Sequence, residues 1–70
     1  MKVTVVNCLS AGIRKNIDNP NCDQTIVRTV SAGEKVEIDQ SITGYDWKDR
    51  LFYKCTSPVD GWIAAGLVET

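Results

Sequence analysis

Residues that commonly carry enzyme chemistry are sparse in this chain of 70 residues. The chain contains no histidine, which is the side chain that most often serves as a general acid or base. Its thiols are Cys8, Cys22 and Cys55, and a nucleophilic cysteine needs a neighbouring base or a strongly positive setting. Arg14 or Arg28 could come near Cys22, but nothing in the sequence requires it. The sequence therefore predicts a protein that is not an enzyme and has no catalytic residues and no cofactor.

The same residues also argue against a metal site. The cysteines form no Cys-x-x-Cys pair, and there is no histidine to complete a zinc site. The acidic and amide side chains of residues 16–23 lack the EF-hand spacing for calcium, so we expect a solvated loop tip there. An odd number of thiols is unusual for a secreted disulfide framework. Three reduced thiols are favoured, and a Cys8–Cys22 bridge remains the alternative.

The charge balance limits the partners. The formal net charge is −1, and the lysines and arginines are scattered, so nothing attracts the chain to phosphate backbones or anionic lipid. The apolar run Val3–Val6 is too short for a signal peptide or a membrane span. We therefore expect no nucleic-acid and no membrane partner. If Met1 is the native start, we expect a cytoplasmic protein; as part of a larger protein, it would be extracellular or in the cell wall.

The aromatic side chains are the informative candidates for binding. Tyr45 and Trp47 lie in a polar stretch, Ser41–Asp49, that reads as a long loop. One interpretation is that this loop folds back as a lid over one end of the domain, and the other is that both rings form a contact surface. Tyrosine and tryptophan combine a large apolar area with a polar tip, as binding hot spots do. On the second interpretation, Trp47→Ala removes partner binding and leaves the melting temperature nearly unchanged.

Three more residues complete the predicted ligand-binding set. Phe52 is out of phase with Tyr53 and Cys55, so it points to the opposite face of its strand if those two point inward. Trp62 begins the last long strand and sits at the margin of the surface, with core packing as the alternative. Arg14, together with Lys15, is placed to steer an acidic peptide, although such an exposed pair is usually ordinary surface.

Short strands separated by turn signals make up most of the chain, which at this length is one domain, 1–70. Val36 and Ile38 alternate with Lys35 and Glu37, so the first two face inward. Gly33 closes a turn that suits a positive φ. From Leu9 to Gln24 the pattern loosens into a loop, with one brief extended piece at Ile13–Arg14. The predicted strands are Val3–Val6, Thr25–Val30, Glu34–Asp39, Leu51–Thr56 and Gly61–Ala64, followed by a 3₁₀ turn at Ala65–Gly66 and the apolar pair Leu67–Val68.

The order of these parts resembles the bacterial SH3-like (SH3b) domain family. The matching parts are Ile13-Arg14, Ile26–Val30, Gly33, Val36 with Ile38, Phe52-Tyr53-Lys54-Cys55, Ser57–Gly61, Gly61-Trp62-Ile63 and Leu67-Val68. The resemblance implies an all-β fold, a small SH3-like barrel of five to six short strands with a filled interior. It also implies a buried thiol at Cys55, where the family usually has a branched apolar residue. The segment Asp39–Leu51 is longer than usual for the family.

The resemblance implies a function in binding. Family relatives commonly hold cell-wall peptide or other short segments in a shallow groove between the long first loop and the loop that faces it. We therefore expect a peptide or protein partner, recognised by a small free-standing bacterial or phage protein. A cell-wall targeting domain excised from a larger wall-acting protein is the first alternative, and a self-assembling structural subunit is the second. The sequence leaves the oligomeric state open.

Overall fold

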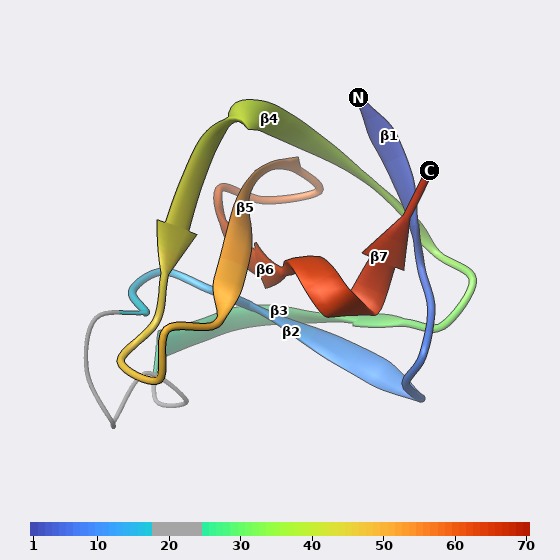
Figure 1. Cartoon of the computed structure of the whole chain (residues 1–70). Helices are drawn as coiled ribbons and strands as arrows, with labels where there is room; N and C mark the ends of the chain where they lie inside the picture. The colour runs from blue at the N-terminus through green and yellow to red at the C-terminus, as the bar shows by residue number, and fades with distance from the viewer. Residues whose placement is uncertain (18–24) are drawn as a thin grey trace.

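The computed structural model describes residues 1–17 and 25–70, and these residues form seven β-strands and one short 3₁₀ helix (Figure 1). The helix, η2, spans Ala65–Leu67, so the predicted 3₁₀ turn at this place is confirmed. The strands in chain order are β1 (Lys2–Val5), β2 (Ser10–Arg14), β3 (Ile26–Ser31), β4 (Lys35–Tyr45), β5 (Leu51–Ser57), β6 (Gly61–Ala64) and β7 (Val68–Glu69).

All the described strands belong to one antiparallel sheet with the order β3-β2-β6-β5-β4-β1-β7. The predicted all-β class is therefore confirmed. The sheet curls strongly on itself (Figure 1), but within the described residues its outer strands β3 and β7 are not paired with each other, so it is an open sheet. The predicted number of five to six strands is too low. The brief piece around Arg14 and the end of the chain at Val68 are both hydrogen-bonded strands.

Strand β2 replaces part of the loop predicted from Leu9 to Gln24. Its residues Ser10, Ala11 and Gly12 have low intrinsic preference for strands. They form a strand because β2 pairs with β3 along its length and with β6 at Arg14, so the pairing overrides local preference. The prediction of a loop is therefore wrong for Ser10–Gly12, whereas the extended piece predicted at Ile13–Arg14 is confirmed.

Strand β4 is eleven residues long and links two parts of the sheet. It was predicted to end at Asp39 but continues to Tyr45, so the predicted loop begins later than expected. Its register with β5 shifts between Asp39 and Thr43. There the Asp39 carboxylate accepts hydrogen bonds from the Ser41 hydroxyl at 2.6 Å and the Ser41 backbone N–H at 3.0 Å. These bonds hold the pKa of Asp39 below its usual value. Near its start β4 pairs with β1, from Lys35 to Glu37, and it pairs with β5 from Glu37 to Asp39 and again from Thr43 to Tyr45.

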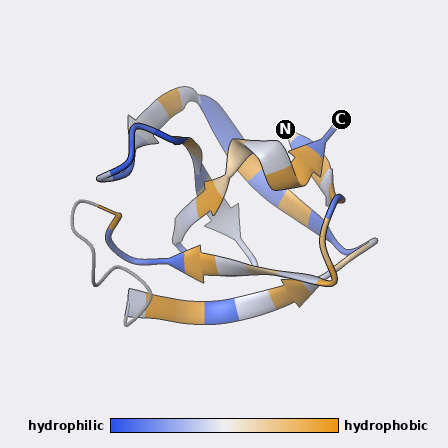
Figure 2. Ribbon diagram, turned by 60° about the horizontal axis from the view of Figure 1, so that its bottom comes forward, coloured by the Kyte–Doolittle hydropathy of each residue, from blue (hydrophilic) through white to orange (hydrophobic). Residues whose placement is uncertain are grey.

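The core lies inside the curled sheet and is built mainly from β-branched side chains. Apolar and hydrophilic residues alternate along the strands (Figure 2). Val36 and Ile38 are buried as predicted, and so is the thiol of Cys55. Fully burying one such aliphatic side chain stabilises the fold by about 1.5–3 kcal/mol. The buried core cluster consists of Val3, Val5, Ala11, Ile13, Val30, Val36, Ile38, Cys55, Ile63 and Val68.

The turn between β3 and β4 is tied to β1. Gly33 has φ +88°, so the predicted positive φ is confirmed. Its N–H donates to the carbonyl oxygen of Val5 at 2.9 Å, and the N–H of Val5 donates to the carbonyl oxygen of Glu34 at 2.9 Å. These bonds hold β1 beside the turn, which fixes the start of β4.

Candidate functional site

The turn between β4 and β5 is organised by the buried carboxylate of Asp46. One carboxylate oxygen accepts hydrogen bonds from the backbone N–H groups of Lys48 (2.9 Å) and Arg50 (2.8 Å). The other accepts from the Arg50 guanidinium, at 2.7 Å from Nε and 2.6 Å from a terminal nitrogen. Loss of water around the carboxylate acts to raise its pKa, but the hydrogen bonds from Arg50 and Lys48 outweigh this and hold the pKa of Asp46 below its usual value. The turn is therefore a defined shape rather than an open loop.

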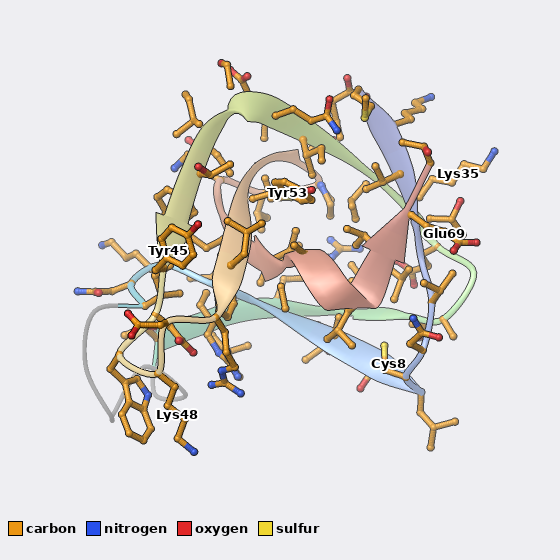
Figure 3. The ribbon with its side chains drawn as sticks, in the orientation of Figure 1. Cys8, Lys35, Tyr45, Lys48, Tyr53 and Glu69 are labelled. Atoms are coloured by element: carbon orange, nitrogen blue, oxygen red, sulfur yellow. The ribbon has the colours of Figure 1, made fainter. Side chains whose placement is uncertain are left out.

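Two of the predicted ligand-binding aromatics flank Asp46, and both rings are exposed. Tyr45 is 61% exposed at the end of β4, and Trp47 is 44% exposed in the turn. The ammonium group of Lys48 lies 4.7 Å from the centre of the Trp47 ring. Figure 3 shows Tyr45 and Lys48 on the side of the molecule opposite Lys35. The exposure of both rings favours the interpretation of this segment as a contact surface over its interpretation as a lid.

Phe52 is placed differently from the surface position predicted for it. It does lie on the opposite face of β5 from Cys55, which is in the core cluster. However, that outer face is covered, and Phe52 is only 2% exposed. The guanidinium carbon of Arg14 lies 5.8 Å from the centre of its ring. The prediction of Phe52 as an exposed ligand contact is therefore corrected, because neighbouring side chains cover its ring.

The cover on this outer face comes from a second group of packed side chains. Phe52 pairs with Gly44 in the β4–β5 ladder, and opposite residues in a ladder share a face. A Cβ atom added at Gly44 would lie 3.2 Å from the ring of Trp62 and 3.5 Å from the side chain of Ile17. We call these residues, Arg14, Ile17, Phe52 and Trp62, the outer cluster. Ile17 is buried in it and Trp62 is half-buried.

A hollow of about 320 Å³ opens beside the outer cluster, and we call it the first hollow. It brings together two of the predicted ligand-binding residues, Tyr45 from the end of β4 and Trp62 from the start of β6. Arg14 pairs with Trp62 in the β2–β6 ladder and lies next to Lys15, which does line the hollow. Trp47 does not line it. The full lining is Lys15, Asn16, Ile17, Gly44, Tyr45 and Trp62.

Sequence reasoning named Lys15 only beside Arg14, and it did not place Asn16, Ile17 or Gly44 in a site. Gly44 carried a signal, because a glycine within a strand often marks a close approach by another group. Here that group is the indole of Trp62, which the missing side chain of Gly44 allows to lie against β4. Asn16 and Ile17 carried no comparable signal, because their position depends on how the chain leaves β2.

Two further hollows open on the surface. The second hollow, of about 410 Å³, is lined by Lys15, Val27, Lys54, Val59, Asp60 and Gly61. The third hollow, of about 480 Å³, lies between the start of β5 and η2. Its lining is Arg50, Leu51, Ala64, Ala65, Gly66 and Leu67. None of the predicted ligand-binding residues lines either of these two hollows.

The two described cysteines differ in their surroundings. Cys55 is fully buried, and burial raises the pKa of its thiol, which donates a hydrogen bond to the carbonyl oxygen of Ser57 at 3.2 Å. Cys8 is half-buried near the turn between β1 and β2 (Figure 3). Both are free thiols. Cys22, the partner in the alternative Cys8–Cys22 bridge, lies outside the described residues.

Metal ligands do not gather in the part of the chain that the structure describes. Within residues 1–17 and 25–70, no three cysteine, aspartate or glutamate side chains come together in a group able to hold a metal ion. The acidic and amide residues weighed as a calcium loop lie outside these ranges, apart from Asn16. No helix among the described residues has the length and apolarity needed to cross a bilayer.

Comparison of the chain with protein-family models, with curated proteins and with solved structures finds no match in any of the three. The candidate site is therefore defined by its own geometry: two aromatic rings from different strands that border one open hollow, next to an ordered turn.

Proposed function

We propose that this chain is a non-catalytic module that binds an extended peptide segment of a partner protein in the first hollow. The observation that carries this proposal is that Tyr45 and Trp62 line one open hollow of about 320 Å³ together with Ile17. Aromatic walls with polar tips suit extended peptides, because the rings contact apolar side chains while the polar atoms bond the peptide backbone. The lack of histidine and the burial of Cys55 support a role without catalysis.

We further propose that the fold is a small barrel of the bacterial SH3-like type. The bent β4, which pairs with both β1 and β5, supports this proposal, since a shared strand lets one sheet curl over a single core. The helix η2 before the last strand also supports it, as does the pairing of that last strand with β1. In this reading β2 and β3 belong to the long first loop of the family.

The proposal is tested by selecting binders from a library of random linear peptides displayed on phage. We expect the wild-type protein to enrich a family of sequences, and their affinities are then measured by fluorescence anisotropy. Tyr45→Ala and Trp62→Ala should each weaken the selected peptides about thirtyfold, the effect of losing a hot spot of about 2 kcal/mol. Because Tyr45 is 61% exposed, its variant should keep the melting temperature of the wild type.

Two control variants separate the first hollow from other surfaces. Trp47 lies in the adjacent turn but outside the hollow, and Lys35 lies on the far side (Figure 3). Trp47→Ala and Lys35→Ala should bind the selected peptides as the wild type does. If Trp47→Ala abolishes binding while Tyr45→Ala does not, the contact surface is the turn and the hollow is not the site. If the library gives no binder, the proposal fails.

The two alternative functions considered from the sequence, cell-wall targeting and self-assembly, are tested in parallel with peptide binding. Cell-wall targeting predicts that the protein sediments with purified peptidoglycan and that Tyr45→Ala stays in solution. Self-assembly predicts a mass above that of one chain in light scattering. One observation favours self-assembly specifically: the edge strand β3 carries the exposed apolar pair Ile26 and Val27. Unpaired strand edges with exposed apolar side chains are sites of association between chains.

A further inference from the structure

The second hollow is a neighbour of the first. Lys15 lines both of them. Lys54, which lines the second hollow, pairs directly with Trp62 in the β5–β6 ladder, and its ammonium nitrogen lies 5.5 Å from the centre of the Trp62 ring. Trp62 lines the first hollow. A chain segment lying in the first hollow therefore reaches the second by passing Lys15 or Trp62.

The lining of the second hollow combines positive charge with apolar surface. It contains two ammonium groups, from Lys15 and Lys54, and one carboxylate, from Asp60. Neither lysine forms a salt bridge with a carboxylate in the described part of the chain. Val27 is 50% exposed and Val59 is half-buried, so both offer apolar contact. The hollow thus has a positive excess although the whole chain has a net charge of −1.

We propose that the second hollow takes the side-chain carboxylate of an aspartate or glutamate in the same peptide that occupies the first hollow. This inference rests on the proposed function and specifies its ligand as an acidic linear peptide. Lys15 and Lys54 meet the carboxylate, because an anionic acceptor makes stronger hydrogen bonds to ammonium groups than a neutral one does. Val27 and Val59 contact the methylene groups that carry it. Asp60 disfavours an acidic group placed at its own side of the hollow.

The test uses the peptides selected by the wild-type protein and a matched set in which each acidic residue is replaced by its amide. We expect aspartate or glutamate at one recurring position of the selected sequences. Replacing that residue by asparagine or glutamine should weaken binding to the wild type about fivefold, the upper range for a partly exposed ion pair. The same replacement should have a smaller effect on binding to Lys54→Ala or Lys15→Ala, because one of the two charge partners of the carboxylate is already gone. Lys54→Glu should select lysine or arginine at this position instead.

Control variants test whether the acidic preference depends on the second hollow. Lys35→Ala removes an ammonium group on the far side of the molecule and should leave the acidic preference unchanged (Figure 3). Lys54 contacts Trp62, so its variants are first checked for an unchanged melting temperature. Lys15 is exposed and provides a second variant whose folding is not at risk. If peptides bind but show no acidic preference, or if the amide versions bind equally well, the inference is wrong while peptide binding stands. If no peptide binds, both fail.

Discussion

The carboxylate of Asp46 and the guanidinium of Arg50, four residues apart, meet at 2.6 and 2.7 Å at the base of the β4–β5 turn. The same carboxylate also accepts two backbone N–H groups of the turn. Asp46 is thus the point to which the turn is tied. Tyr45 precedes it and Trp47 follows it, so the directions of both exposed rings depend on this one side chain.

Asp46→Asn should lower the melting temperature at neutral pH, because an amide cannot replace the charge and cannot accept hydrogen bonds with both of its terminal atoms. The pKa of Asp46 is lowered in the folded state. Its contribution to stability is therefore complete above the unfolded value, about 3.9, and is lost as the pH falls through the folded value. Thermal melts of both proteins from neutral to acid pH should converge below this range. Asp49→Asn, at an exposed residue of the same turn, should match the wild type, and curves that stay parallel into acid would contradict the role given to Asp46.

Phe52→Ala should remove about 3–5 kcal/mol of stability, because the ring is 2% exposed and its loss leaves a cavity in the outer cluster. A core of this size supplies only about 3–5 kcal/mol in total, so the variant should be largely unfolded. Trp47→Ala, at an exposed ring of the adjacent turn, should change stability by no more than about 0.5 kcal/mol. Urea denaturation followed by far-UV circular dichroism measures both. A stable Phe52→Ala variant would mean that the outer cluster does not hold the sheet.

Gly61→Ala and Gly66→Ala should have opposite effects. A Cβ atom at Gly61 would lie 2.6 Å from a methyl carbon of Ile13 and 2.9 Å from the carbonyl oxygen of Arg14. Strand β6 could then no longer approach β2, at a cost of about 1–3 kcal/mol. Nothing lies within 4 Å of the same atom at Gly66, where alanine should stabilise the fold by about 0.4–1 kcal/mol through the unfolded chain. Chemical denaturation measures the free energy of unfolding of both variants. Equal changes in the two variants would contradict the close approach of β6 to β2 at Gly61.

Cys8 should react with thiol reagents in the native protein, whereas Cys55 should react only after unfolding. Cys55 is fully buried and its pKa is raised by burial, so it holds little of the reactive thiolate. The raised pKa also means that stability is lost as the pH rises above the ordinary thiol value of about 8.5. The measurement is thiol titration in a Cys22→Ser background, with and without denaturant. Two fast thiols in the native protein would show that Cys55 is accessible.

The sequence predicts this fold best where each residue is placed by its own strand. The alternation of Val36 and Ile38, the turn at Gly33 and the 3₁₀ turn at Ala65 all follow from local pattern, and all are present. Prediction fails where pairing with a strand distant in the sequence determines the secondary structure. Ser10–Gly12 is part of a strand because β3 pairs with it, and β4 runs past Asp39 because β5 pairs with it again from Thr43 to Tyr45.

The candidate site follows the same division. The exposure of Tyr45 and Trp47 agrees with their polar surroundings in the sequence. The burial of Phe52 does not follow from its own strand, because a strand shows which face a residue takes but not what covers that face. The guanidinium of Arg14 lies over the Phe52 ring. Ile17 and Trp62 lie close to Gly44, the partner of Phe52 in the β4–β5 ladder. Tertiary packing, rather than residue type, therefore decides which aromatic side chains are exposed.

The position of Trp62 makes it a natural optical reporter. Its indole borders the first hollow on one side, and the ammonium group of Lys54 from the second hollow lies over its ring. The chain has two tryptophans, so Trp47→Phe leaves this indole as the sole long-wavelength emitter. A ligand bound in the first hollow alters the emission of Trp62 directly. A ligand bound in the second hollow alters it by shifting the ammonium group of Lys54. A single fluorescence signal thus follows occupancy on both sides of one ring.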